Sequence, residues 1–226
     1  MKIILTGATG FIGGAVLRQC LTNDNISHVF VLTRKPLPEA VSGNGKVTVI
    51  IHDDFSTYSP EVLEKVAGAE GCIWAVGGRA TQFSDVNTAK KVSVDYTIAA
   101  AKAFIAALAP ELLSRKGNKF RFVFCSGKFA EWDQQKRLSF MSDTRHIKGQ
   151  VERGLCELAD ANADRFEVWC ARPSGVLPTD AGLATKAIGK LYGAIGVDHL
   201  ASAMIKVCLQ GYPQRIIEND ELLRIK

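Results

Sequence analysis

The fold is decided by the stretch Ile3-Ile4-Leu5-Thr6-Gly7-Ala8-Thr9-Gly10-Phe11-Ile12-Gly13. Its apolar start predicts a buried strand, and the apolar residues that recur with helical spacing after Gly10 predict a helix. Glycines at 7, 10 and 13 suit a tight turn whose backbone approaches a phosphate group, although an ordinary strand–helix turn can carry the same triplet. The N–H groups and the dipole at the helix start favour an anion there. We therefore predict a pyrophosphate-binding turn formed by Gly7, Thr9, Gly10, Phe11, Ile12 and Gly13.

Strands and helices alternate along the rest of the chain. Apolar runs predict strands at residues 3–5, 28–33, 46–51, 71–76, 120–125, 166–171 and 216–217. Helical spacing and start signals predict helices from residues 11 and 59, over 87–109, 144–159 and 183–195, and after a capping Asp198. This alternation is typical of an α/β fold with one doubly wound, Rossmann-type parallel sheet and helices on both faces. We predict one domain over residues 1–226, in which residues 127–143 and 177–226 contribute to a substrate pocket.

Composition narrows the class of protein. A chain of 226 residues with 47% hydrophobic residues can bury a core without disulfides. The net charge of +5 is not concentrated in long runs, so it suits an anionic cofactor and does not by itself indicate nucleic acid. The six cysteines lie scattered in apolar runs, which predicts buried free thiols. With no apolar stretch near the ~20 residues of a membrane span, we expect a cytoplasmic protein that binds neither membranes nor nucleic acid, and we predict no metal site.

The end of the second predicted strand points to the identity of the cofactor. Enzymes that prefer NAD place an acidic residue there, about 20 residues after the glycines, to accept from the ribose 2′-hydroxyl. This chain instead has Arg34 and Lys35, and Arg34 follows Gly13 by 21 residues. A guanidinium can bind a 2′-phosphate through paired hydrogen bonds. We therefore predict NADP(H) as cofactor, whereas the alternative is that both cations only solvate the strand end.

Two further strand ends extend the predicted cofactor site. Asp54 and Phe55 follow the third strand and would reach the adenine edge, although a loop Asp beside a packed Phe is the alternative. After the fourth strand, the chain would pass the cofactor's sugar and diphosphate, and glycine there could also serve only to turn the chain. The residues predicted to line this passage are Ala75, Val76 and Gly77.

Taken together, these motifs resemble the atypical short-chain dehydrogenases/reductases. The likeness rests on residues 6–13, the Asp54-Phe55 pair, Ser126 at a strand end, Lys148, and Arg172-Pro173. It is strongest to the Tat-interacting-protein-like oxidoreductases, an NADP(H)-binding branch related to nucleotide-sugar epimerases, and it covers nearly the whole chain. The resemblance implies an NADP(H)-dependent oxidoreductase that acts on a small molecule. Backbone groups of Pro173 and Val176 would then pass the nicotinamide carboxamide.

The resemblance also implies a catalytic Ser followed by Tyr-x-x-x-Lys on a helix. In such a site the Tyr protonates a carbonyl oxygen, the Lys lowers the Tyr pKa and holds the nicotinamide ribose, and the Ser binds the substrate oxygen. Ser126 and Lys148 match, but Thr144 occupies the Tyr position. A Thr hydroxyl is a much weaker acid than a phenol and is too short to reach the same point. Helical geometry directs His146 away from the stripe formed by Thr144 and Lys148, so it is not an obvious substitute.

Three functions remain open from the sequence. The favoured one is an NADPH-dependent reductase or epimerase-like enzyme whose proton donor is not the usual Tyr. The others are a non-redox isomerase or dehydratase that reuses the pocket, and a catalytically silent NADP(H)-binding regulator. A homodimer through the helices at 87–109 and after Thr144 is a further possibility. Tyr96, on the helix near the end of the fourth strand, is the best placed of the tyrosines to replace the missing phenol, although we expect it to be an ordinary half-buried helix Tyr. The loop after Ser126 contributes large side chains that would either wall a substrate pocket or pack the loop: Phe129, Trp132, Phe140 and Met141.

Overall fold

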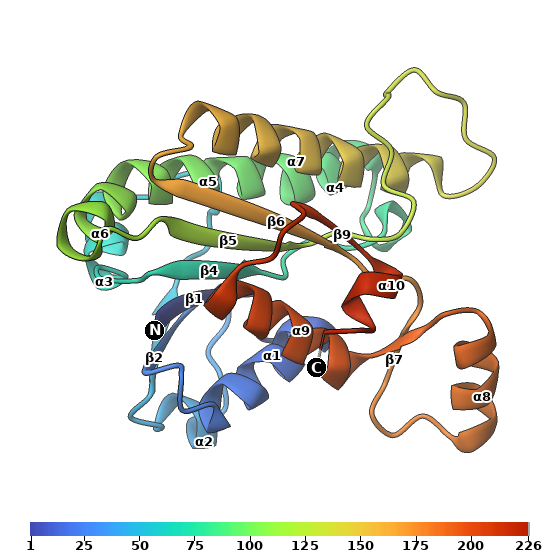
Figure 1. Cartoon of the computed structure of the whole chain (residues 1–226), viewed down its shortest axis with the longest axis horizontal. Coiled ribbons are helices and arrows are strands. Elements are labelled where there is room, and N and C mark those ends of the chain that lie inside the picture. Colours follow the sequence, from blue (N-terminus) through green and yellow to red (C-terminus); the bar gives the residue numbers. More distant parts are fainter. Residues whose placement is uncertain (226) are drawn as a thin grey trace.

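The computed structural model describes residues 1–225, apart from the side chains of residues 184, 186, 188 and 190. Seven parallel strands form one sheet in the order β3-β2-β1-β4-β5-β6-β9 (Figure 1). Their bounds are β1 (Lys2–Thr6), β2 (His28–Thr33), β3 (Val47–Ile51), β4 (Gly71–Trp74), β5 (Phe120–Cys125), β6 (Phe166–Arg172) and β9 (Ile216–Glu218). The strand order reverses at β1, and such a switch point opens a crevice at the carboxyl ends of the strands.

The strands are apolar because helices cover both faces of the sheet. Alternate residues of a strand face opposite layers, so Phe122 and Phe124 of β5 enter one core and Val123 enters the other. Helices α5 (Tyr96–Ala107) and α7 (Ser142–Ala161) cover the first face, and α1 (Phe11–Thr22) and α9 (Val197–Gln210) cover the second (Figure 1). The predicted doubly wound α/β sheet is confirmed.

Shorter elements complete the described chain. They are α2 (Glu39–Ser42), α3 (Pro60–Lys65), the 3-10 turn η1 (Ala80–Gln82), α4 (Val86–Lys90), the π-helical segment η2 (Lys91–Asp95), α6 (Ala109–Lys116), α8 (Leu183–Leu191) and α10 (Asn219–Leu222). A separate parallel pair joins β7 (Val176–Leu177) to β8 (Ile195–Gly196). Figure 1 shows α8 and the loop after β5 both projecting beyond the carboxyl end of the sheet.

The predicted continuous helix over 87–109 is wrong. It is divided into α4, η2 and α5, and α5 stops at Ala107 because Pro110 lies in the first turn of α6 and cannot continue the preceding hydrogen bonds. The Thr97 hydroxyl of α5 donates to the Ser93 carbonyl of η2 over 2.6 Å. A π turn keeps most of the same residues buried, so the apolar stripe in the sequence does not reveal it.

The predicted boundaries near the C-terminus also need correction. The helix expected over 183–195 ends at Leu191, because the chain turns at Gly193 with a φ of +68° and Ile195 enters β8. Asp198 does not cap α9; Gly196 holds that position, and Asp198 accepts from the Thr179 hydroxyl in the first turn. The fourth strand ends at Trp74 rather than at residue 76.

Two predictions from composition can be compared with the structure. All six cysteines are buried free thiols, as expected. Within residues 1–225, no single helix has the length and hydropathy to cross a membrane; the segments Val86–Ala107 and Ala109–Lys116, bent by 42°, reach that threshold only as a pair.

Candidate functional site

The turn between β1 and α1 has the geometry expected of a phosphate cradle. Gly7 has a φ of +70°, and a Cβ there would lie 2.5 Å from the carbonyl oxygen of Ala75. A Cβ on Gly13 would lie 2.1 Å from the carbonyl oxygen of Gly7, so only glycine lets α1 start this close to the strand. Gly10 caps α1 without a side-chain hydrogen bond, and the first turn contains no acidic residue. The positive end of α1 therefore faces the crevice without a neutralising group of its own.

The predicted 2′-phosphate contacts lie at the next strand end. Arg34 and Lys35 follow β2 and are exposed, and β2 pairs with β1 so that their carboxyl ends are adjacent. Among the ion pairs of residues 1–225, neither side chain takes part in one. Both cations are thus available to an anion at this edge.

The adenine contacts predicted at the end of β3 are only partly available. Asp54 is exposed and accepts from both the N–H and the hydroxyl of Ser56, at 2.9 and 2.6 Å, and these hydrogen bonds lower its pKa. Phe55 is only 3% exposed, and its ring packs 5.8 Å from Trp74 and 6.1 Å from Tyr96. Its side chain therefore belongs to the core, which matches the alternative of a packed Phe, and only its backbone could reach a ligand. Tyr96 is half-buried, as expected.

Lys148 points inward from α7, as its position on the helix predicts. It is 9% exposed, and its Nζ donates to the Cys125 carbonyl over 3.0 Å and lies 4.9 Å from the centre of the Phe124 ring. A Cβ on Gly77 would lie 3.5 Å from both this Nζ and the Ser93 Oγ. The Ser93 Oγ is itself buried and has no hydrogen-bond partner. Burial lowers the pKa of Lys148, because desolvation disfavours the charged ammonium.

Thr144, in the position of the expected Tyr, makes a contact that the sequence does not reveal. Its Oγ1 accepts the backbone N–H of Ala80 in η1 over 2.8 Å. This bond ties the start of α7 to the segment that follows β4. Because the hydroxyl oxygen accepts here, its own proton is still available for donation. His146 faces the other way, as expected, with its Nε2 lying 3.1 Å from the Lys136 carbonyl oxygen.

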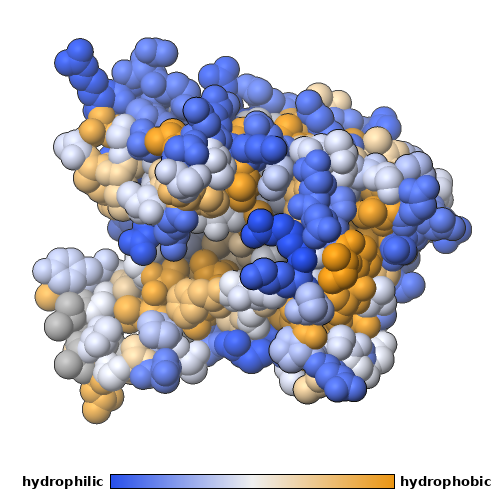
Figure 2. Space-filling model, turned by 180° about the vertical axis from the view of Figure 1, so that it is seen from behind, coloured by the Kyte–Doolittle hydropathy of each residue, from blue (hydrophilic) through white to orange (hydrophobic). Residues whose placement is uncertain are grey.

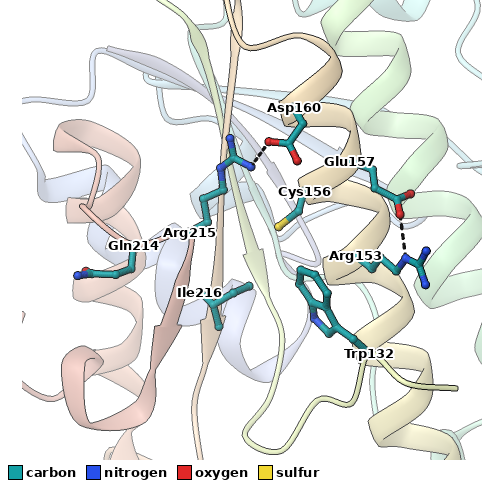
Figure 3. Close-up of a pocket in the computed structure, with 8 residues that line it drawn as sticks. All are labelled: Trp132, Arg153, Cys156, Glu157, Asp160, Gln214, Arg215 and Ile216. Carbon is teal, nitrogen blue, oxygen red and sulfur yellow. Dashed lines mark hydrogen bonds and ion pairs between the residues drawn. The ribbon is translucent and has the colours of Figure 1, made fainter. Parts of the chain in front are cut away.

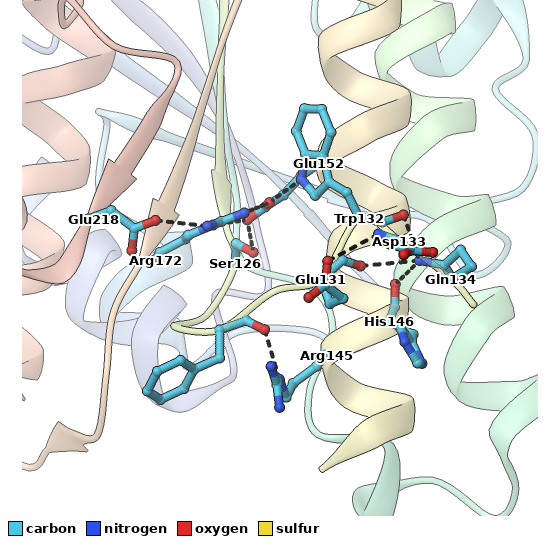
Figure 4. A network of polar contacts seen from close by, with 11 residues as sticks. Ser126, Glu131, Trp132, Asp133, Gln134, Arg145, His146, Glu152, Arg172 and Glu218 are labelled. Carbon is cyan, nitrogen blue, oxygen red and sulfur yellow. Dashed lines mark hydrogen bonds and ion pairs between the residues drawn. The ribbon is translucent and has the colours of Figure 1, made fainter. Parts of the chain in front are cut away.

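Ser126 belongs to a buried polar network (Figure 4). Its hydroxyl donates to Glu152 over 2.6 Å, and Glu152 is fully buried. The same carboxylate accepts from the Trp132 indole at 2.8 Å and from Arg172 at 2.9 and 2.5 Å. Burial opposes the charge of Arg172, but its hydrogen bonds to Glu152 and Glu218 outweigh burial and raise its pKa.

This network changes the role that Ser126 can play. A carboxylate only accepts hydrogen bonds, and a serine has a single O–H. With that proton directed at Glu152, Ser126 presents lone pairs to the site rather than the donor that the resemblance implies. The sequence contained one signal for this arrangement: Glu152 follows Lys148 and Thr144 at intervals of four on the buried stripe of α7, where an isolated charge requires a partner.

Two cavities flank α7. One of about 610 Å³ lies between α7 and β9 and is lined by Trp132, Arg153, Cys156, Glu157, Asp160, Gln214, Arg215 and Ile216 (Figure 3). The other, of about 480 Å³, lies along α4, α5 and α7 and also includes Trp132. Neither lining includes a residue of the glycine turn. Figure 2 shows a different hollow, between the projecting parts of the chain, with hydrophobic residues along it. Among the described residues, no cluster of His, Cys, Asp and Glu is suited to hold a metal.

No family model matches the chain. It is 34% identical over 168 residues to leucinostatins biosynthesis cluster protein T of Purpureocillium lilacinum, and this match covers 74% of the chain but only 56% of that protein. The chain therefore spans little more than half the length of this curated relative.

Several solved structures share the fold of the chain at low sequence identity. Carbonyl reductase Sniffer of D. melanogaster has a TM-score of 0.74 at 15% identity and covers 97% of this chain and 96% of its own. Gre2 of Candida albicans, in complex with NADPH, has a TM-score of 0.71 at 18% identity over 96% of this chain and 77% of its own. The short-chain dehydrogenase/reductase YIR035C of Saccharomyces cerevisiae has a TM-score of 0.71 at 12% identity over 99% and 98%. The chain has the fold of the short-chain dehydrogenases/reductases, as its motifs predicted.

Proposed function

We propose that this chain is an NADP(H)-dependent oxidoreductase of the atypical short-chain dehydrogenase/reductase type, with a non-standard active site. The observation that carries the proposal is the glycine turn, in which Gly7 and Gly13 leave no space for a side chain and the start of α1 is open to an anion. Similarity to a protein of a biosynthesis cluster supports a small-molecule substrate.

The remaining residues of the crevice fit the same cofactor. Arg34 and Lys35 would bind the 2′-phosphate, because they are exposed cations at the adjacent strand end. The buried ammonium of Lys148 and the unpartnered hydroxyl of Ser93 lie near Gly77 and would hold the nicotinamide ribose. When bound, NADPH supplies a hydride.

The chain must also supply a proton to the substrate oxygen. Helix α7 offers two donors: the Thr144 hydroxyl, whose oxygen already accepts from Ala80, and the ammonium of Lys148. An ammonium is a much stronger acid than an aliphatic hydroxyl, and burial lowers the pKa of Lys148 further. We assign the proton to Lys148 and a hydrogen bond to the substrate oxygen to Thr144. Ser126 orients the substrate as an acceptor while Glu152 holds its proton.

The hydrogen bonds of the two hydroxyl groups at the site favour a second candidate function, a silent NADP(H)-binding regulator. Thr144 and Ser126 both make structural hydrogen bonds, to Ala80 and to Glu152, and the usual Tyr is absent. An isomerase or dehydratase that reuses the pocket is a third candidate.

The test combines binding with turnover. NADPH and NADH titrations measure the cofactor preference, and NADPH oxidation is followed against a panel of ketones and quinones. The enzyme proposal expects tight NADPH binding and turnover with at least one substrate, and Thr144→Tyr should raise the rate by restoring a phenol. Tight binding with no turnover in either protein supports the regulator, and failure to bind NADPH refutes both.

A further inference from the structure

The loop after β5 and the first turns of α7 form a cluster of aromatic rings and cations at the carboxyl end of the sheet. The rings of Phe129 and Phe140 meet edge to face at 5.6 Å. The Arg145 guanidinium lies 4.6 Å from the Phe140 ring centre and 5.8 Å from that of Phe129, and the Lys128 Nζ lies 5.3 Å from the Phe129 ring. We refer to these four residues as the aromatic–cation cluster.

The cluster adjoins the proposed catalytic positions. Arg145 follows Thr144, and Lys128 is two residues beyond Ser126. The Lys128 N–H donates to the Pro173 carbonyl over 2.7 Å, which places the loop against the segment proposed to pass the nicotinamide. A ligand in contact with the cluster would thus lie at the same end of the sheet as the proposed site.

The cluster presents a free apolar surface. Phe129 and Phe140 are 51% and 49% exposed, although large aromatic side chains are normally buried. Phe129 and Met141 are the two non-glycine residues in the described chain with positive φ, at 70° and 48°. Such strain in bulky residues is found where the surrounding structure holds a side chain in place for a site.

The cationic groups of the cluster lack carboxylate partners. The Arg145 Nε donates to the Phe129 carbonyl over 2.9 Å, which fixes the guanidinium and leaves its two terminal nitrogens as a free fork (Figure 4). Within residues 1–225, neither Arg145 nor Lys128 forms an ion pair. The Glu131 carboxylate is itself paired with Lys136 at 2.7 Å, which lowers its pKa, and the charge of Arg145 adds to this shift. A fixed fork of this kind matches a carboxylate.

We propose that the aromatic–cation cluster binds the carboxylate of a substrate that also carries a flat apolar group, so that the substrate class is an aromatic or similarly planar organic acid. This inference rests on the proposed function for its role in catalysis, but the binding itself does not require turnover. The Arg145 fork and Lys128 bind the carboxylate, and the Phe129 and Phe140 rings contact the apolar group.

The experiment uses 2-naphthoate and its neutral analogue 2-naphthalenemethanol as probes, titrated by calorimetry into the protein with and without saturating NADP⁺. We expect naphthoate to bind the wild type at least tenfold more tightly than the alcohol. Arg145→Met keeps the stem that packs on Phe140 but removes the charge, and should weaken naphthoate at least tenfold, as expected for a charge-assisted hydrogen bond. The matched control is Arg153→Gln, an exposed arginine of the same helix that pairs with Glu157, which should leave naphthoate binding unchanged.

Several results would overturn the inference. Equal affinity of the acid and the alcohol would show an apolar surface only, and unchanged naphthoate binding by Arg145→Met would exclude the fork. If circular dichroism shows that Arg145→Met does not fold, Lys128→Gln is tested instead, because it keeps the hydrogen bond from Arg145 to the loop. We then expect Lys128→Gln to weaken naphthoate binding at least threefold, and unchanged binding would refute the inference. NADPH titration of each variant separates the carboxylate-binding inference from the proposed function. Naphthoate binding without NADPH binding would refute only the proposed function.

Discussion

Replacement of Glu152 tests the buried network around Ser126. Four hydrogen bonds, one from Ser126, one from Trp132 and two from Arg172, converge on this fully buried carboxylate. In Glu152→Gln one acceptor oxygen is replaced by an NH₂ group, so at least one of these donors faces another donor. Arg172 keeps only Glu218, whose side chain is 49% exposed.

The expected loss of unfolding free energy depends on which groups Glu152→Gln leaves unpaired. Removal of one partner from a buried ion pair costs about 3–5 kcal/mol, chiefly through the remaining buried charge. Because Arg172 retains Glu218 and Gln keeps one acceptor, we expect the lower end, about 3 kcal/mol. The control is Glu157→Gln, which breaks an exposed pair with Arg153 on the same helix and should cost less than about 1 kcal/mol.

Urea unfolding, followed by tryptophan fluorescence, measures the free energy of unfolding of both variants. Because Trp132 is a member of the network, its fluorescence also reports on the network directly. The double variant Glu152→Leu with Arg172→Met removes both charges and should be more stable than Glu152→Leu alone. A cost for Glu152→Gln no larger than that for Glu157→Gln would refute the reasoning, because it would mean that the four hydrogen bonds to this carboxylate do not stabilise the fold.

Three further predictions concern the cofactor site. Arg34→Asp should weaken NADPH binding at least tenfold and leave NADH binding unchanged or stronger, measured by fluorescence titration; unchanged NADPH affinity would contradict the 2′-phosphate assignment. Gly13→Ala should abolish NADPH binding and destabilise the fold by about 1–3 kcal/mol, because its Cβ would lie 2.1 Å from a carbonyl oxygen, whereas Gly45→Ala has open space and should do neither. Because burial lowers the pKa of Lys148, the unfolded chain binds more protons than the folded one between the lowered pKa and the ordinary value of about 10.4. The stability of the wild type relative to Lys148→Met should therefore rise with pH through that window, and a constant difference in urea midpoints would argue against the burial cost.

The sequence could predict the sheet because each strand and the glycine turn depend on local signals. Apolar runs identify buried parallel strands, and Gly7 and Gly13 occur where the backbone approaches itself too closely for a side chain. The inward direction of Lys148 was also predictable, since helical spacing alone determines it. The interruption of the predicted helix by η2 was not, because a π turn leaves the apolar periodicity almost intact.

The polar network was not predictable because its members are distant in the sequence. Ser126, Glu152 and Arg172 meet only when β5, β6 and α7 pack together, and no local pattern gives their distances. The surroundings of Phe55 were unpredictable for the same reason. Its position after β3 suggested the adenine edge, but packing against Trp74 and Tyr96 turns the ring into the core.

The burial of Lys148 is unfavourable for the chain alone. The residue is 9% exposed, and its Nζ donates to the Cys125 carbonyl and lies over the Phe124 ring. Among the described residues it forms no ion pair. A buried charge with so few partners reduces stability, and the unpartnered Ser93 hydroxyl adds to that cost. A ligand that offers hydroxyl groups to both would recover part of this energy, and binding to the folded state alone raises stability with ligand concentration. Under the proposed function, NADP(H) binding should therefore stabilise the folded protein through these two residues, whether the chain catalyses a reaction or is a silent regulator.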